Sequence, residues 1–75
     1  MTAPFPFWVW ITGYPGSATR IAQARDHRHA IALAAATWRA HHHGEILEVA
    51  SVEENPFKST RRRFVRMTSR GVEFL

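Results

Sequence analysis

The stretch Phe7-Trp8-Val9-Trp10-Ile11-Thr12 is built from aromatic and β-branched residues, and it lies between Pro6 and Gly13. Such residues favour strands, and proline and glycine mark strand ends, so the sequence predicts a strand over residues 7–12. Side chains alternate between the two faces of a strand, which places Trp8 and Trp10 together on one face. The other face is also apolar, whereas a strand covered by a helix on one side needs only one apolar face.

A chain reversal is predicted directly after this strand. The sequence Gly13-Tyr14-Pro15-Gly16-Ser17 places proline at the second position and glycine at the third position of a four-residue turn. This combination is the signature of a type II turn, because proline fixes its own φ and glycine accepts a positive φ.

Residues 19–25 fit either a second strand or the start of a long helix. A helix that included them would be about 37 Å long, against about 20 Å for the strand that it must cross. A helix that begins after Asp26, a good N-cap, would extend about 25 Å over residues 27–43, and Gly44 is placed to end it in a left-handed conformation. We therefore expect residues 19–25 to form a strand, with the long helix as the alternative.

The predicted helix has one apolar side. Its run of small residues, Ala34-Ala35-Ala36, lets the helix lie close to a sheet, with Ile31, Leu33 and Trp38 expected to fill the space around it. The apolar side comprises Ala30, Ile31, Ala34, Ala35 and Trp38. The solvent-facing side comprises Arg28, Arg39 and His42.

Two further strands are predicted after Gly44, over residues 45–53 and 60–68. Residues 54–59 between them are long enough to form the loop of a hairpin. Strands that are adjacent in sequence usually pair, so we expect these two to be antiparallel neighbours.

The sequence thus predicts a single small α+β domain over residues 1–75. Its expected architecture is ββαββ, a largely antiparallel four-stranded sheet with one helix on one face, and the alternative is βαββ with a longer helix. The end segments, residues 1–6 and 69–75, are expected to be loosely ordered. For residues 71–75 a short extra strand is the other outcome left open.

The composition is that of a globular protein with excess positive charge. Hydrophobic residues make up 45% and charged residues 21% of the 75 residues, an ordinary globular mixture. A chain this short lies near the lower limit for a self-sufficient core, which makes a partner subunit an early expectation. Ten Lys and Arg against six Asp and Glu give a net charge of +4, which favours anionic partners.

The absence of cysteine excludes disulfides, thiolate metal sites and cysteine nucleophiles. No apolar run approaches the roughly 18 residues that cross a membrane, and the first residues lack the positive charge of a secretory leader. We therefore expect a cytoplasmic protein that makes no membrane contact.

Candidate binding residues come from the strand over residues 60–68 and from the tryptophans. On this strand Val65 and Met67 lie on one face, and if they face the helix, the opposite surface is aromatic and cationic. The candidate partner-binding residues on that surface are Trp8, Trp10, Arg62, Phe64 and Arg66.

Two interpretations of this surface stay open. Single-stranded nucleic acids are bound by surfaces on which bases stack on aromatic rings while guanidinium groups hold phosphates. Homodimer interfaces are enriched in the same residue types, and the small core makes the dimer the preferred interpretation. The run Arg61-Arg62-Arg63 adds local charge, but glutamates on the preceding strand, among them Glu48 and Glu53, are expected to pair with part of it.

The histidines suggest a metal site only weakly. Helical ligands converge at a spacing of three or four residues, whereas His41, His42 and His43 are consecutive and His27 and His29 are two apart. We predict no metal and no cofactor.

No nucleophile lies in a triad or nucleophile-elbow motif, so catalysis is not expected. The sequence thus predicts a non-catalytic interaction module, a homodimer that recognises a macromolecule through its aromatic and arginine-bearing sheet face. A single-stranded RNA- or DNA-binding protein is the first alternative. A small toxin-like ribonuclease, which would use histidine and arginine without metal, is the second.

Overall fold

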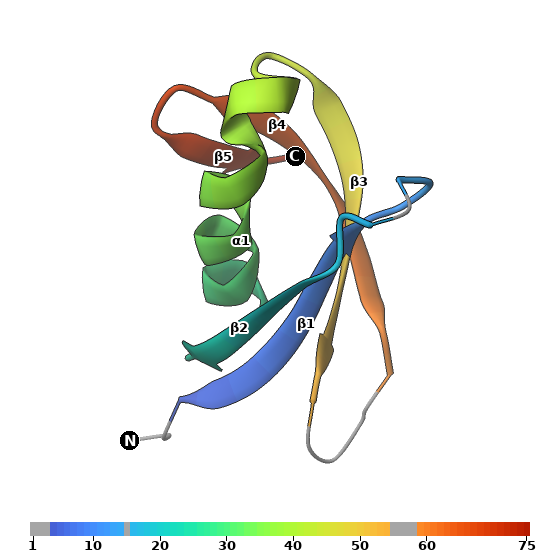
Figure 1. Cartoon of the computed structure of the whole chain (residues 1–75), viewed down its shortest axis with the longest axis vertical. Coiled ribbons are helices and arrows are strands. Elements are labelled where there is room, and N and C mark those ends of the chain that lie inside the picture. The colour runs from blue at the N-terminus through green and yellow to red at the C-terminus, as the bar shows by residue number, and fades with distance from the viewer. Residues whose placement is uncertain (1–3, 15, 55–58) are drawn as a thin grey trace.

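The computed structural model describes residues 4–14, 16–54 and 59–75, apart from the side chains of residues 39 and 40. Figure 1 shows one helix beside one sheet. The elements in chain order are β1 (Phe5–Ile11), β2 (Thr19–Ala24), α1 (His27–His42), β3 (Ile46–Glu53), β4 (Arg61–Thr68) and β5 (Gly71–Phe74). No helix in the described part of the chain is long and apolar enough to cross a membrane.

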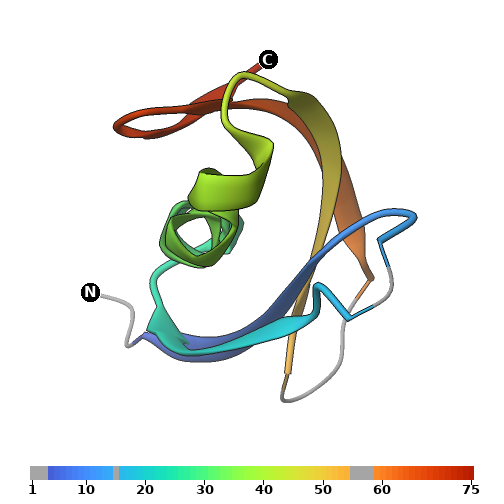
Figure 2. The same cartoon turned by 45° about the horizontal axis from the view of Figure 1, so that its top comes forward.

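The strands form one antiparallel sheet in the order β2-β1-β3-β4-β5. The sheet curls around α1, which lies along its concave side (Figure 2). The predicted α+β class, the helix on one face and the β3–β4 hairpin are confirmed. The predicted count of four strands is wrong, because Gly71–Phe74 forms a fifth strand, β5, that pairs with β4.

Strand β5 pairs with β4, its residues Val72 and Phe74 pack against the core, and cation–π contacts add to these interactions. The ring of Phe74 lies 4.7 Å from the guanidinium carbon of Arg28 on α1 and 5.2 Å from that of Arg63 on β4. Guanidinium groups are attracted to aromatic faces at this distance. Phe74 therefore attaches β5 to both the helix and the sheet, a contact between distant residues that no local pattern predicts.

The structure also decides between the two interpretations of residues 19–25. They belong to β2 as far as Ala24, and α1 begins at His27, so the longer helix is wrong. The Asp26 side chain accepts a hydrogen bond of 2.8 Å from the His29 backbone N–H, as an N-cap does. At the other end Gly44 has φ 84°, the left-handed conformation expected after a helix C-terminus.

The turn after β1 has two features of the predicted type II turn. The Ser17 N–H donates to the Tyr14 carbonyl over 3.2 Å, and Gly16 has φ 85°. Pro15 lies outside the described residues. Ser17 also ties the turn to the strand, because its Oγ accepts a hydrogen bond of 2.8 Å from the Ile11 backbone N–H.

The core lies between α1 and the concave face of the sheet. Every residue predicted for the apolar side of the helix is buried there. Leu33, which was expected to fill space beside them, is instead 42% exposed because it lies on the solvent side of α1. The buried cluster comprises Phe7, Val9, Ile11, Ala24, Ala30, Ile31, Ala34, Ala35, Trp38, Leu47, Val49, Val65 and Met67.

The close approach of α1 to the sheet depends on its alanines. Ala35 is completely buried, whereas its neighbour Ala36 is exposed. We expect Ala35→Leu to lower the free energy of unfolding by about 1–3 kcal/mol, because a larger side chain overfills a packed core. Ala36→Leu should change it by no more than about 0.5 kcal/mol. Urea unfolding at one protein concentration measures both, and equal effects would contradict the packing described here.

Candidate functional site

The five candidate partner-binding residues lie together on the face of the sheet that α1 leaves uncovered. Along β1, Trp8 and Trp10 alternate with core residues, so both indoles project from the convex side. Along β4, Arg62, Phe64 and Arg66 alternate with the core residues Val65 and Met67. We call this surface the outward face; it comprises Trp8, Trp10, Arg20, Ile46, Glu48, Ala50, Val52, Arg62, Phe64, Arg66 and Glu73.

The centre of the outward face is buried although no helix covers it. Ala50 is completely buried and Val52 is 8% exposed, and the strand register places Ala50 between Trp10 and Arg62. Larger neighbouring side chains therefore shield these two small residues from water. The indole of Trp8, opposite Val52, is itself half-buried, so the tryptophans do not stand free of the sheet.

Arg20, the cross-strand neighbour of Trp8, forms an ion pair on the outward face. It donates to both carboxylate oxygens of Glu54, over 2.6 Å and 3.0 Å. The Arg20 guanidinium holds the pKa of Glu54 below its usual range. The sequence analysis placed Glu54 in the hairpin loop and did not predict its pair with Arg20.

The two other outward arginines differ in their partners. Arg66 donates to Glu73 on β5 over 2.9 Å. Arg62 is exposed, and no residue in the described part of the chain pairs with it. Beside these charges lie two apolar side chains, Phe64 at 55% and Ile46 at 52% exposure.

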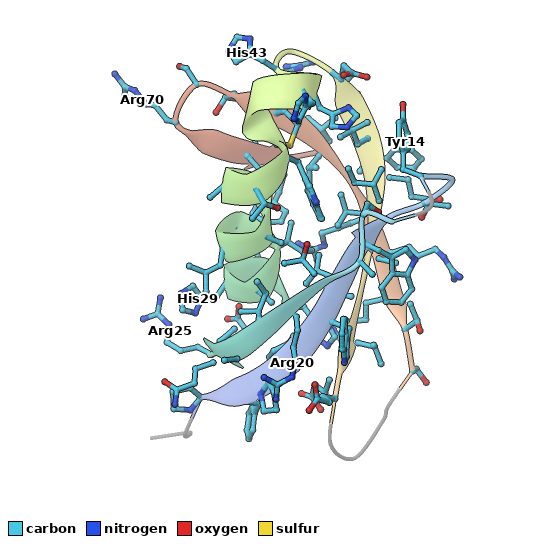
Figure 3. All side chains as sticks on the ribbon, in the orientation of Figure 1. Tyr14, Arg20, Arg25, His29, His43 and Arg70 are labelled. Carbon is cyan, nitrogen blue, oxygen red and sulfur yellow. The ribbon has the colours of Figure 1, made fainter. Side chains whose placement is uncertain are left out.

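A second candidate site lies on the helix side of the sheet and was not predicted. It is a cavity of about 470 Å³, lined by Arg25, Asp26, His27, Glu53, Ser59 and Arg61. Figure 3 shows Arg25 beside His29 at the N-terminal end of α1. The lining comes from the segment before α1, from the first turn of α1, and from the ends of β3 and β4.

His27 is held in place at this cavity. Its Nδ1 lies 2.7 Å from Oγ of Ser51, which is completely buried on β3. Its ring meets the Phe7 ring edge-on, with 5.0 Å between the centroids. Burial lowers the pKa of His27 below its ordinary value of 6.5, and the positive charge of Arg61 acts in the same direction. The imidazole is therefore neutral at neutral pH.

Sequence reasoning missed this cavity because it depends on the β3–β4 register. Alternation already predicted that Arg61 and Arg63 would face away from Arg62, but only the register places Arg61 opposite Ser51. The other histidines form no comparable site. His42 pairs with Glu45 over 2.9 Å, and within residues 4–14, 16–54 and 59–75 no three ligating side chains are grouped to hold a metal ion.

No protein-family model, curated protein or solved structure matches this chain.

The half-buried position of His27 predicts a specific dependence of stability on pH. Its folded pKa lies below the value of about 6.5 for an unfolded histidine. The unfolded chain therefore binds an additional proton as pH falls below 6.5, and the free energy of unfolding decreases across that window. His27→Gln removes this proton, so its unfolding free energy should fall less between about pH 7 and pH 5.

Urea unfolding at a series of pH values measures how the free energy of unfolding changes with pH. His43→Gln is the control for the loss of one histidine, because His43 is exposed at the opposite end of α1 (Figure 3). If the free energy of unfolding changes with pH equally in His27→Gln and in the unaltered protein, His27 does not titrate as described.

Proposed function

We propose that this chain is a non-catalytic, cytoplasmic interaction module that forms a homodimer through its outward face. The observation that supports this most directly is the pair of exposed apolar side chains, Phe64 and Ile46, on the sheet face that α1 does not cover. Half-buried Trp8 and Trp10 extend the same surface. Aromatic residues and arginine are the residue types that protein interfaces favour over the remaining surface.

The balance of charge favours a second copy of the chain as the occupant. The outward face carries three arginines, Arg20, Arg62 and Arg66, and two glutamates, Glu48 and Glu73. Glu54, directly after β3, adds a third carboxylate through its pair with Arg20. A two-fold interface presents the same patch on both partners, so a patch with both signs of charge can complement itself. Against Arg62, which has no partner in the described part of the chain, the second copy can present Glu48.

The same balance weighs against a nucleic-acid partner at this face. A strand of RNA or DNA needs an excess of cations, because its affinity comes mainly from neutralised phosphates. Arg20 and Arg66 are already paired with glutamates, and the outward charges cancel. The ring of Trp8 is also half-buried, so it offers little surface for stacking.

The size of the chain supports a dimer as well. A 75-residue chain can build only a small core, and much of this one consists of alanine and valine. Burial of an additional apolar surface contributes about 25 cal/mol per Å². Association of the outward faces would therefore add stability that a single copy lacks.

Solution mass tests the proposal. Light scattering should give about twice the 8.6 kDa mass of the chain. Phe64→Asp places a carboxylate on the exposed apolar part of the outward face and should produce a monomer, because an unpaired charge is costly to bury. Leu33→Asp is the matched control, since it replaces an exposed apolar residue on α1 and should leave the dimer intact.

Two results would contradict the proposal. A monomeric unaltered protein at micromolar concentration would remove the dimer. Tight, salt-dependent binding of a fluorescent single-stranded oligonucleotide that Phe64→Asp abolishes would assign the outward face to nucleic acid instead.

A further inference from the structure

Two charges of opposite sign lie on the interior strands of the outward face without a partner. Arg62 on β4 is exposed and Glu48 on β3 is half-buried, and neither forms an ion pair within the described residues. The ion pairs of this face instead involve the edge strands, with Arg20 on β2 and Glu73 on β5. The chain therefore neutralises the charges beside its sheet edges and leaves one cation and one anion open between them.

The strand register places these two charges at opposite corners of a small square. Arg62 lies opposite Ala50, and Glu48 lies opposite Phe64. Glu48 and Arg62 thus occupy one diagonal of the square, and Ala50 and Phe64 occupy the other. Residues at such diagonal positions are about 7–8 Å apart, which long side chains can span. In this structure Glu48 and Arg62 do not pair, so both charges are available to a partner.

Two-fold symmetry can bring the ends of this diagonal together between two copies. In an isologous dimer, a contact of one residue with a second residue of the partner is repeated with the two copies exchanged. An axis that lies in the interface and bisects the line from Glu48 to Arg62 would therefore create two identical ion pairs. The other diagonal would lie close to this axis. Phe64 would then meet Phe64 of the second copy, and the small side chain of Ala50 would leave room for the approach.

We infer that reciprocal ion pairs, Arg62 of each copy with Glu48 of the other, set the register of the homodimer. The pairs presuppose the proposed dimer and add the contact that selects the partner and its orientation. The guanidinium group is a planar fork of donors that matches a carboxylate, so the pair is sensitive to geometry. Because both charges lose water on association, the pair contributes more to specificity than to net affinity.

The apolar part of the outward face does not fix an orientation by itself. Ile46 and Phe64 supply exposed apolar surface, but the hydrophobic effect has no direction. Charges penalise every register in which like signs meet. A dimer that placed Arg62 against Arg62 of the second copy would hold two cations together. The ion pairs therefore exclude such registers, and they disfavour a partner that lacks a carboxylate at the position of Glu48.

Reversal of the two charges in separate proteins tests the inference. Arg62→Glu and Glu48→Arg should each weaken homodimerisation by about 100-fold or more, because like charges then meet twice in every dimer. In an equimolar mixture one variant is negative at both positions and the other is positive at both, so both ion pairs can form again. The mixture should yield a heterodimer with an affinity within about tenfold of that of the unaltered dimer. Sedimentation equilibrium measures the affinities, and native mass spectrometry identifies the heterodimer.

The mixture also distinguishes ion pairs between copies from an ion pair within one chain. If Glu48 paired with Arg62 of its own chain, neither variant would regain its partner on mixing. Arg66→Glu and Glu73→Arg are the matched controls, since these residues already pair within one chain over 2.9 Å. Their mixture should show no preference for the heterodimer. Circular dichroism melting confirms that each variant is folded.

Neutral replacements provide a second measurement if a reversed charge prevents folding. Arg62→Gln and Glu48→Gln each leave one charge of every pair without its partner and should weaken the dimer by about tenfold. The two replacements in one chain should weaken it no more than either alone, because both partners are then removed together.

Failure of the dimer and failure of the ion pairs are distinguishable. If the unaltered protein is a monomer, the proposed function is wrong and the ion pairs are wrong with it. If it is a dimer and Arg62→Glu and Glu48→Arg associate as tightly, the dimer stands and only the ion pairs are wrong. Weakened variants whose mixture yields no heterodimer would also overturn the ion pairs. So would a control mixture that prefers the heterodimer as strongly, since this would indicate general attraction between charged faces.

Discussion

A single helix can cover only one face of the five-stranded sheet, and the remaining features of the molecule follow from this constraint. The alanines of α1, which include the completely buried Ala34 and Ala35, let the helix lie against the concave side and close the core there. The helix is too short to cover the whole of that side, so a cavity is left beside His27. It covers none of the convex side, where apolar side chains remain in contact with water.

Because side chains alternate along a strand, neighbouring residues lie on opposite sides of the sheet. The consecutive residues Arg61 and Arg62 separate, the first to the cavity and the second to the outward face. Glutamates pair with Arg20 and Arg66, two of the three outward arginines. Exposed apolar side chains, Phe64 and Ile46, lie on the convex side. The proposed homodimer would bury them against a second copy of the chain.

Local signals were sufficient for much of the fold and for the outward face. The aromatic composition of residues 7–12 located β1, the N-cap at Asp26 located the boundary between β2 and α1, and the left-handed Gly44 located the end of α1. Each of these signals depends on neighbouring residues. Alternation alone placed the candidate binding residues on one surface. Contacts between distant segments were not predictable. Strand β5 depends on Phe74 lying between two arginines from other elements, and the cavity depends on the register that places Arg61 opposite Ser51.

The account rests on the outward face being buried between two copies, and distances between nitroxide labels test this most directly. The chain has no cysteine, so a single cysteine introduced by Arg62→Cys or by Ala36→Cys can carry one label. Spectra of fully labelled protein are compared with those of labelled protein diluted into unlabelled protein. We predict dipolar broadening that dilution removes for the label at residue 62, and none for the label at residue 36 on the solvent side of α1. The absence of broadening at residue 62, or broadening at residue 36 alone, would contradict the account.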